Sequence, residues 1–199
     1  MSVVAAIEPH IRVAEVERVL HKPSENLKAY ELALRGRWTY ERGGKANIEE
    51  AARLFRHAIA SDPNYGRPYA YLARSLFALV ANQWTEPSED ELAEYVSLAR
   101  TAVRLGQGDP ERLRVAAQIV ALPGGELEEG IAIIDRALMQ TPNSVEILAM
   151  SGILRAYAGD TEIAFRHLRK ADMLTPPGVH ANGKCFGLSL ACLVDGLSC

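Results

Sequence analysis

The chain has 199 residues, 48% apolar and 24% charged, and a formal net charge of −3. This length and apolar content are those of one folded domain, and the charge lacks the basic excess of nucleic-acid-binding proteins, so we expect no direct nucleic-acid ligand. No basic stretch precedes the first apolar residues, so we expect no signal peptide. No apolar run approaches the roughly 18 residues of a membrane span. The sequence therefore predicts a cytoplasmic protein.

Residues 1–25 are predicted to form a leading helix and a linker. Ile7, Ile11, Ala14 and Val19 lie on one helical stripe, and Pro23 ends it. Proline ends a helix because it cannot donate the helical hydrogen bond. We expect this helix to cap the helix pair that follows it.

Two helix pairs are predicted next, over about residues 26–65 and 66–108. Ala51, Phe55 and Ala58 share a helical stripe that stops at Pro63. The pattern restarts at Tyr69. An insertion, ANQWTEPSED at residues 81–90, separates the two helices of the second pair. Within it, Ser88 and Glu91 have the spacing of a capping box at a helix start.

Two further pairs are predicted over about residues 109–142 and 143–176. Asp109 is an N-cap candidate followed by Pro110 at the first helical position. Asn143 and Glu146 have capping-box spacing. Pro142 is expected to end the second helix of the third pair.

Residues 177–199 resemble the first helix of an incomplete fifth unit or a C-terminal cap. Its leucines have no second helix to cover them, so we expect them to fold back or to support self-association. Cys185, Cys192 and Cys199 lie seven residues apart. This odd number with no CxxC pair gives neither a disulfide framework nor a zinc site, so we expect reduced thiols.

The helix pairs repeat with a nearly constant period. Ala137 and Ala171 are 34 residues apart, Ala102 and Ala137 are 35 apart, and the insertion lengthens the step from Ala58 to Ala102 to 44. Over residues 26–196, this period of paired amphipathic helices resembles the tetratricopeptide (TPR) family. The resemblance implies an all-α fold, a right-handed superhelical α-solenoid of helix-turn-helix units.

Residue sizes agree with that fold. Gly152 and Ala164 stand where the two helices of a unit cross, and only small side chains let the backbones approach there. Larger residues such as Phe55, Ile134 and Leu168 are predicted to fill the space toward the neighbouring unit.

The N-terminal segment has a second resemblance. It is similar to the segment that precedes the TPR region of bacterial class III adenylate/guanylate cyclases and of some winged-helix transcriptional regulators. In those families the segment follows a catalytic or DNA-binding domain, whereas this chain begins almost at the segment itself, so the resemblance implies a detached regulatory module and does not imply cyclase activity. The matching residues are Ile7-Glu8-Pro9, Glu15, Arg18, Lys22-Pro23, Asn26-Leu27, Ala29-Tyr30 and Leu34-Arg35-Gly36.

No catalytic, metal or cofactor site is predicted. The stretch GGKAN at residues 43–47 lacks the Ser or Thr of a phosphate-binding loop and follows no strand pattern, so we interpret it as an interhelix turn. His57, Ser61 and Asp62 crowd one helix end and cannot form a catalytic relay.

The expected binding site is the concave face, which the first helix of each unit lines in TPR proteins. Arginines there can hold an acidic or phosphorylated segment, because the guanidinium pairs with two oxygens at once. The alternative is that they only solvate a helix face. Chaperone-binding members carry a Lys/Asn clamp that is absent here, so we expect no binding of chaperone C-termini. The candidate residues are Arg37, Tyr40, Arg67, Arg74, Phe77, Arg114 and Gln118.

The sequence thus favours a non-enzymatic TPR scaffold that binds another protein or peptide, acidic segments included, within a signalling system. The alternative is a fragment of a TPR-containing adenylate cyclase or transcriptional regulator whose output domain is missing from this chain.

Overall fold

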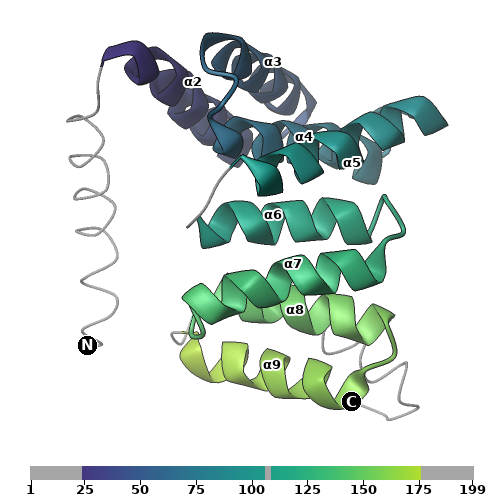
Figure 1. The fold of residues 1–199 in the computed structure, drawn as a ribbon. Coiled ribbons are helices and arrows are strands. Elements are labelled where there is room, and N and C mark those ends of the chain that lie inside the picture. Colours follow the sequence, from purple (N-terminus) through teal and green to yellow (C-terminus); the bar gives the residue numbers. More distant parts are fainter. Residues whose placement is uncertain (1–23, 106–108, 176–199) are drawn as a thin grey trace.

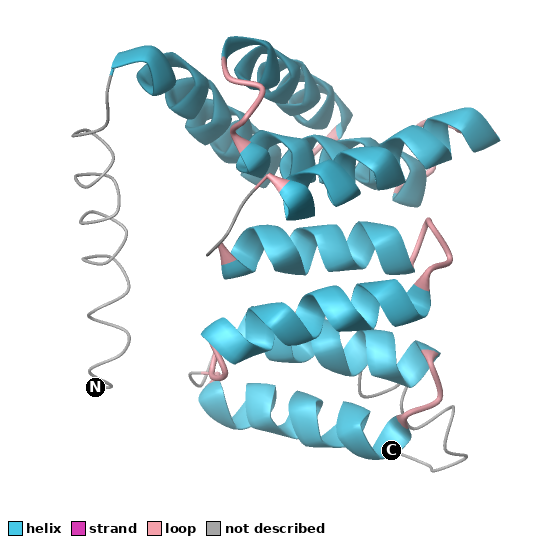
Figure 2. Ribbon diagram, in the orientation of Figure 1, coloured by secondary structure: helices cyan, strands magenta, loops and turns pink. Residues whose placement is uncertain are grey.

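The computed structural model describes residues 24–105 and 109–175, and the regular structure in these ranges is entirely helical, as Figure 2 shows. The predicted leading helix and the incomplete fifth unit fall outside these ranges, except for Ser24 and Glu25. The helices are α2 (Ser24–Glu41), α3 (Lys45–Ser61), α4 (Gly66–Ala81), α5 (Glu89–Arg104), α6 (Pro110–Ala121), α7 (Leu127–Gln140), α8 (Val145–Tyr157) and α9 (Thr161–Leu174).

Consecutive helices pair as antiparallel hairpins, and the hairpins stack along one direction (Figure 1). The pairs are α2 with α3, α4 with α5, α6 with α7, and α8 with α9. The first helices of successive pairs also contact one another, because α4 packs on α6 and α6 packs on α8. This arrangement confirms the predicted all-α solenoid.

Small residues allow the helices of a pair to approach closely, as predicted. A Cβ atom on Gly152 would lie 2.5 Å from Cγ of Leu168 and 3.1 Å from the carbonyl oxygen of Ala164. A Cβ on Gly36 would lie 2.7 Å from the ring of Phe55. Larger side chains at these two glycines would therefore push the paired helices apart.

The helix starts follow the sequence signals with one exception. Ser88 and Glu91 form the predicted capping box, and the carboxylate of Asp109 accepts from the backbone of α6. The N-cap of α8 is Ser144, whereas the spacing had indicated Asn143. Glu146 accepts a hydrogen bond from the Ser144 hydroxyl, 3.1 Å away, so its carboxylate is engaged with the cap side chain.

The main hydrophobic core runs from α3 to α8, and Ala156, Ala164 and Leu168 form a separate cluster between α8 and α9. The main core extends from Ala51 on α3 to Leu154 on α8, and Phe55 stacks on Tyr71 with ring centroids 5.6 Å apart. Since this core crosses the boundaries between pairs, each hairpin depends on its neighbours for burial. No helix in the described ranges is sufficiently long and apolar to cross a membrane.

Two sequence patterns that invited a catalytic interpretation are structural. Gly43 and Gly44 have positive φ angles of 67° and 79° and form the turn between α2 and α3, as predicted. The Ser61 hydroxyl donates to the backbone carbonyl of His57 at 2.9 Å, one helical turn away. That bond involves the His57 main chain, and the imidazole takes no part in it.

Candidate functional site

Four of the predicted binding residues gather on the first helices, and we call them the arginine cluster: Arg37, Arg67, Arg74 and Arg114. Arg37 lies on α2, the next two lie on α4, and Arg114 lies on α6. The packing of α2 on α4 and of α4 on α6 brings these distant parts of the sequence together. The stacking of the first helices therefore places side chains from three helices near one another.

Tyr71 and Glu111 link two of the four arginines, Arg37 on α2 and Arg114 on α6. The guanidinium of Arg37 lies 5.9 Å from the ring centroid of Tyr71, whose hydroxyl donates to Glu111 at 3.4 Å. Arg114 donates two hydrogen bonds to the same carboxylate, at 2.7 and 2.6 Å. The side chain of Arg114 is only 9% exposed. Arg114 is therefore a structural residue, because it holds the Glu111 carboxylate in place.

Arg67 is fixed in a similar way. It donates to Asp109 at 2.7 Å, across 42 residues of sequence, while Asp109 also caps α6. Burial alone would lower the pKa of Arg67, but the charge of Asp109 and this hydrogen bond raise it. Burial also raises the pKa of the neighbouring Tyr65 to about 12, so its phenol stays neutral. A small hollow beside this pair is lined by Ala33, Leu34, Arg37, Tyr65, Arg67 and Tyr71.

Arg74 differs from the other three arginines. Its guanidinium stacks over the ring of Tyr40, 4.9 Å from the centroid, which is a cation–π contact. Within residues 24–105 and 109–175, no carboxylate lies within ion-pair distance of Arg74. The side chain is half-buried. It is thus held in position by Tyr40 with no direct ion pair to a described acid, while its charge still acts on Glu111 from beyond ion-pair distance.

Glu111 stays ionised at neutral pH. Burial would raise its pKa, but the hydrogen bond and charge of Arg114, together with the charges of Arg74 and Arg37, lower it below the ordinary value of 4.5. The ionised carboxylate is fixed to Arg114 by two hydrogen bonds, whereas Arg74 and Arg37 act on it through their charges.

Two predicted binding residues do not join this network. Phe77 is half-buried against the main hydrophobic core. Gln118 is half-buried one helical turn after Arg114. Conversely, Tyr71, Asp109 and Glu111 were not predicted as site residues. The three-residue spacing of Glu111 and Arg114 on one helix was a signal of their pairing.

The described residues contain no group of three or more His, Cys, Asp or Glu that is arranged to hold a metal ion. The three cysteines of the C-terminal segment lie outside the described residues.

Comparison with known proteins shows the fold. No protein-family model matches the sequence, and no curated protein matches it. Several solved structures do match, at low identity. The TPR protein YrrB, described as having an unusual peptide-binding site, is 12% identical with a TM-score of 0.52, and the match covers 90% of this chain and 92% of YrrB.

Two other solved structures are similar. MamA from Desulfovibrio magneticus RS-1, residues 41 to the end, is 14% identical with a TM-score of 0.54, and the match covers 85% of this chain and 94% of that one. A chain of the APC/C complex Cut9–Hcn1 is 16% identical with a TM-score of 0.58, and 93% of this chain matches 36% of it. These likenesses confirm the expected TPR-type solenoid.

Proposed function

We propose that this protein is a non-catalytic scaffold that binds an acidic segment of another protein at the arginine cluster. The observation that carries the proposal is Arg74, whose guanidinium is oriented by Tyr40 and has no carboxylate partner among the described residues. A carboxylate or phosphate of a ligand can form two hydrogen bonds to such a group.

The surrounding network makes this site rigid before a ligand arrives. Arg114 and Glu111 are fixed by two hydrogen bonds, and Arg67 is fixed by Asp109. A ligand that binds Arg74 therefore has to immobilise few side chains, which lowers the entropic cost of binding. Arg37 adds a second contact point, because its ion pair with Glu41 is 40% and 53% exposed and exchanges readily with a ligand acid.

The similar structures are compatible with this proposal. YrrB is described as carrying a peptide-binding site, and the Cut9–Hcn1 structure is a complex of proteins. A TPR solenoid of this kind offers recognition surfaces built from repeated helices.

A second candidate is that the chain is a regulatory module of a signalling protein related to the class III cyclases or winged-helix regulators. The resemblance of residues 7–36 to the segment found in those families supports it. This candidate and the scaffold share one expectation, that the 199-residue chain itself does not convert ATP to a cyclic nucleotide. Incubation with ATP and magnesium, followed by chromatography of the nucleotides, checks that expectation.

The binding proposal is tested with an array of short fluorescent peptides that carry glutamates, each beside a counterpart with glutamine. We expect a subset of the acidic peptides to bind and their glutamine counterparts to bind at least about fivefold more weakly. Arg74→Gln should weaken binding about five- to twentyfold, since one charge-assisted contact is lost.

The matched control is Arg56→Gln, which removes an exposed arginine from α3. It should leave the affinity within about twofold. Equal binding of acidic and glutamine peptides, or equal losses in the two variants, would remove the arginine cluster as the site.

A further inference from the structure

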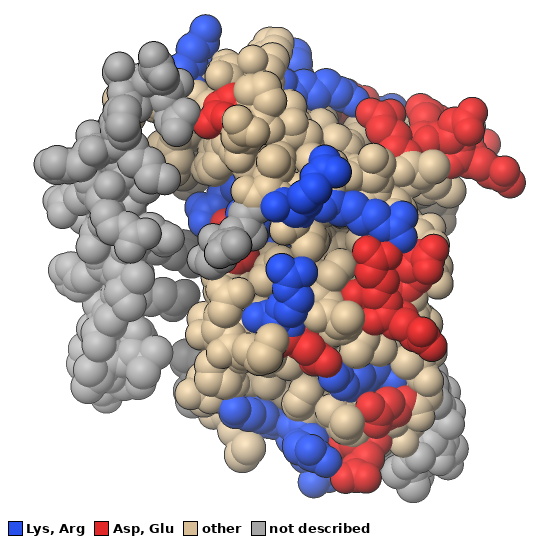
Figure 3. Space-filling view, viewed as in Figure 1, with Lys and Arg blue, Asp and Glu red and all other residues tan. Residues whose placement is uncertain are grey.

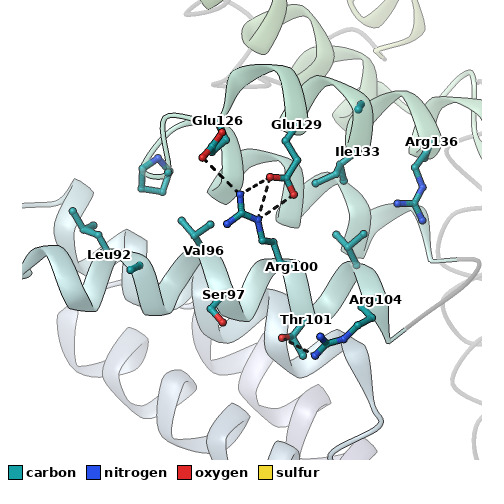
Figure 4. A pocket seen from close by; sticks show the side chains of 15 residues that line it. Leu92, Val96, Ser97, Arg100, Thr101, Arg104, Glu126, Glu129, Ile133 and Arg136 are labelled. Atoms are coloured by element: carbon teal, nitrogen blue, oxygen red, sulfur yellow. Dashed lines mark hydrogen bonds and ion pairs between the residues drawn. The ribbon is translucent and has the colours of Figure 1, made fainter.

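An open groove separates the second helices α5 and α7 (Figure 4). It has a volume of about 880 Å³. Val96 and Ile133 are the buried residues of its lining, and Leu92, Val103 and Pro123 add apolar surface. The arginine cluster lies on first helices, so the groove is a separate surface.

Small side chains keep the groove open. Ala93 and Ser97 on α5 and Ala132 on α7 are exposed and line it. The loop before α7 also comes close to α5, since a Cβ on Gly124 would lie 2.9 Å from a methyl carbon of Val96. These positions give the groove small side chains along its walls, and the Arg100 side chain crosses it from α5 to Glu129.

The groove has opposite charges at its two ends. In Figure 4 both helices run in the same direction, from Leu92 to Arg104 on α5 and from Glu129 to Arg136 on α7, with Glu126 just before α7. Figure 3 shows acidic side chains gathered on the side where these helices begin. The acids of the first turns are Glu89, Asp90, Glu91, Glu128 and Glu129, and of these Glu129 lines the groove, together with Glu126 just before α7.

The other end is basic. Arg104 and Arg136 line it, and in the described part of the chain no carboxylate lies within ion-pair distance of either. At the acidic end, Arg100 reaches from α5 to Glu129 at 2.5 Å and to Glu126 at 3.8 Å, so a basic residue of a ligand would have to replace it there. All three of these side chains are well exposed, so the link is weak and a ligand can displace it.

We propose that this groove binds an amphipathic helix of a partner protein, antiparallel to α5 and α7. Helices commonly carry acids in their first turn and basic residues in their last turn. In the antiparallel orientation, the partner's acidic first turn meets Arg104 and Arg136, and its basic last turn meets Glu126 and Glu129. Its apolar stripe then covers Val96 and Ile133.

The dimensions of the groove suit a short helix. From Leu92 to Arg104 the wall of α5 extends about 18 Å, which matches a partner helix of about 12 residues. Parallel orientation would place like charges together at both ends, which opposes binding. Charge complementarity therefore determines both the partner's chemistry and its direction.

The test uses a display library of short helical peptides as the probe, selected on the full 199-residue protein. We expect the enriched peptides to share an apolar stripe, acids in the first turn and basic residues in the last turn. Ala132→Trp, which fills the groove from an exposed position, should weaken their binding at least about tenfold. Ala60→Trp, at an exposed position on α3, is the matched control and should change it less than about twofold.

Two further sets of variants test whether the peptide binds at the groove or at the arginine cluster. Arg104→Gln combined with Arg136→Gln should weaken binding about five- to tenfold, with a smaller difference at high salt. Arg74→Gln should leave it unchanged. The proposal is overturned if no helical peptide is enriched, if Ala132→Trp and Ala60→Trp behave alike, or if exchanging the charges at the two peptide ends leaves affinity the same.

Discussion

The arginine cluster and the α5/α7 groove use the same residue type in different ways. Arg114 and Arg67 are mostly buried, with side chains 9% and 27% exposed, and they bind the carboxylates of Glu111 in α6 and of its N-cap Asp109. Arg100 is 47% exposed and its acidic partner 39%. Burial makes the first pairs part of the fold, and exposure leaves the second pair exchangeable. An arginine is therefore structural or available according to the packing around it.

The largest expected effect comes from removing the carboxylate of Asp109, which caps α6 and pairs with Arg67 of the arginine cluster. Asp109→Ala deletes the N-cap of α6 and leaves Arg67 without its partner, so we expect the free energy of unfolding to fall by about 2–4 kcal/mol. Urea denaturation followed by circular dichroism measures it.

The control is Asp109→Asn, which keeps a capping oxygen but removes the charge. Its free energy of unfolding should fall clearly less than that of Asp109→Ala. If both variants lose under about 0.5 kcal/mol, as surface substitutions do, the cluster is no more structural than the groove.

An intermediate effect is expected from pH. The pKa of Glu111 is lowered in the folded state, so its ion pair stabilises the protein above the ordinary pKa of 4.5, and that contribution is lost as the pH falls through the folded-state pKa. Because a third of the side chain is exposed, we expect only about 1 kcal/mol.

Thermal unfolding from pH 7 to pH 3 measures this contribution. The wild-type protein should lose stability more steeply below pH 4.5 than Glu111→Gln does. Parallel curves for the two proteins would show that Glu111 is not stabilised by the arginines around it.

The smallest effect is expected in the groove. Glu129→Gln removes the closest partner of Arg100, yet an exposed pair contributes little, so the free energy of unfolding should change by no more than about 0.5 kcal/mol. Urea denaturation beside the Asp109 variants gives the comparison directly. A loss as large as that of Asp109→Ala would mean that the groove pair is structural as well.

The helices and their packing could be predicted because the signals are local. An apolar stripe is read within one helix, and a small residue such as Gly152 contacts the next helix of the same pair. The 34-residue step between Ala137 and Ala171 then shows that the pair is repeated. The N-cap of α8 was misassigned by one residue because Asn143 and Ser144 are adjacent and both can cap.

The pairing within the site could not be predicted in the same way. Arg67 and Asp109 meet only because α4 packs on α6, and the sequence gives no local signal of that contact. Tyr71 was not expected to be a site residue, because its hydroxyl joins the arginine cluster only by donating to Glu111 on α6. The groove was missed because it depends on exposed small residues of two different pairs.

The most direct test of the account is a side-by-side titration of an acidic peptide into the wild-type protein, Arg74→Gln and Arg100→Gln. We predict that Arg74→Gln weakens binding about five- to twentyfold, while Arg100→Gln stays within about twofold of wild type. Equal weakening in both variants, or a loss confined to Arg100→Gln, would contradict the assignment of ligand binding to the arginine cluster.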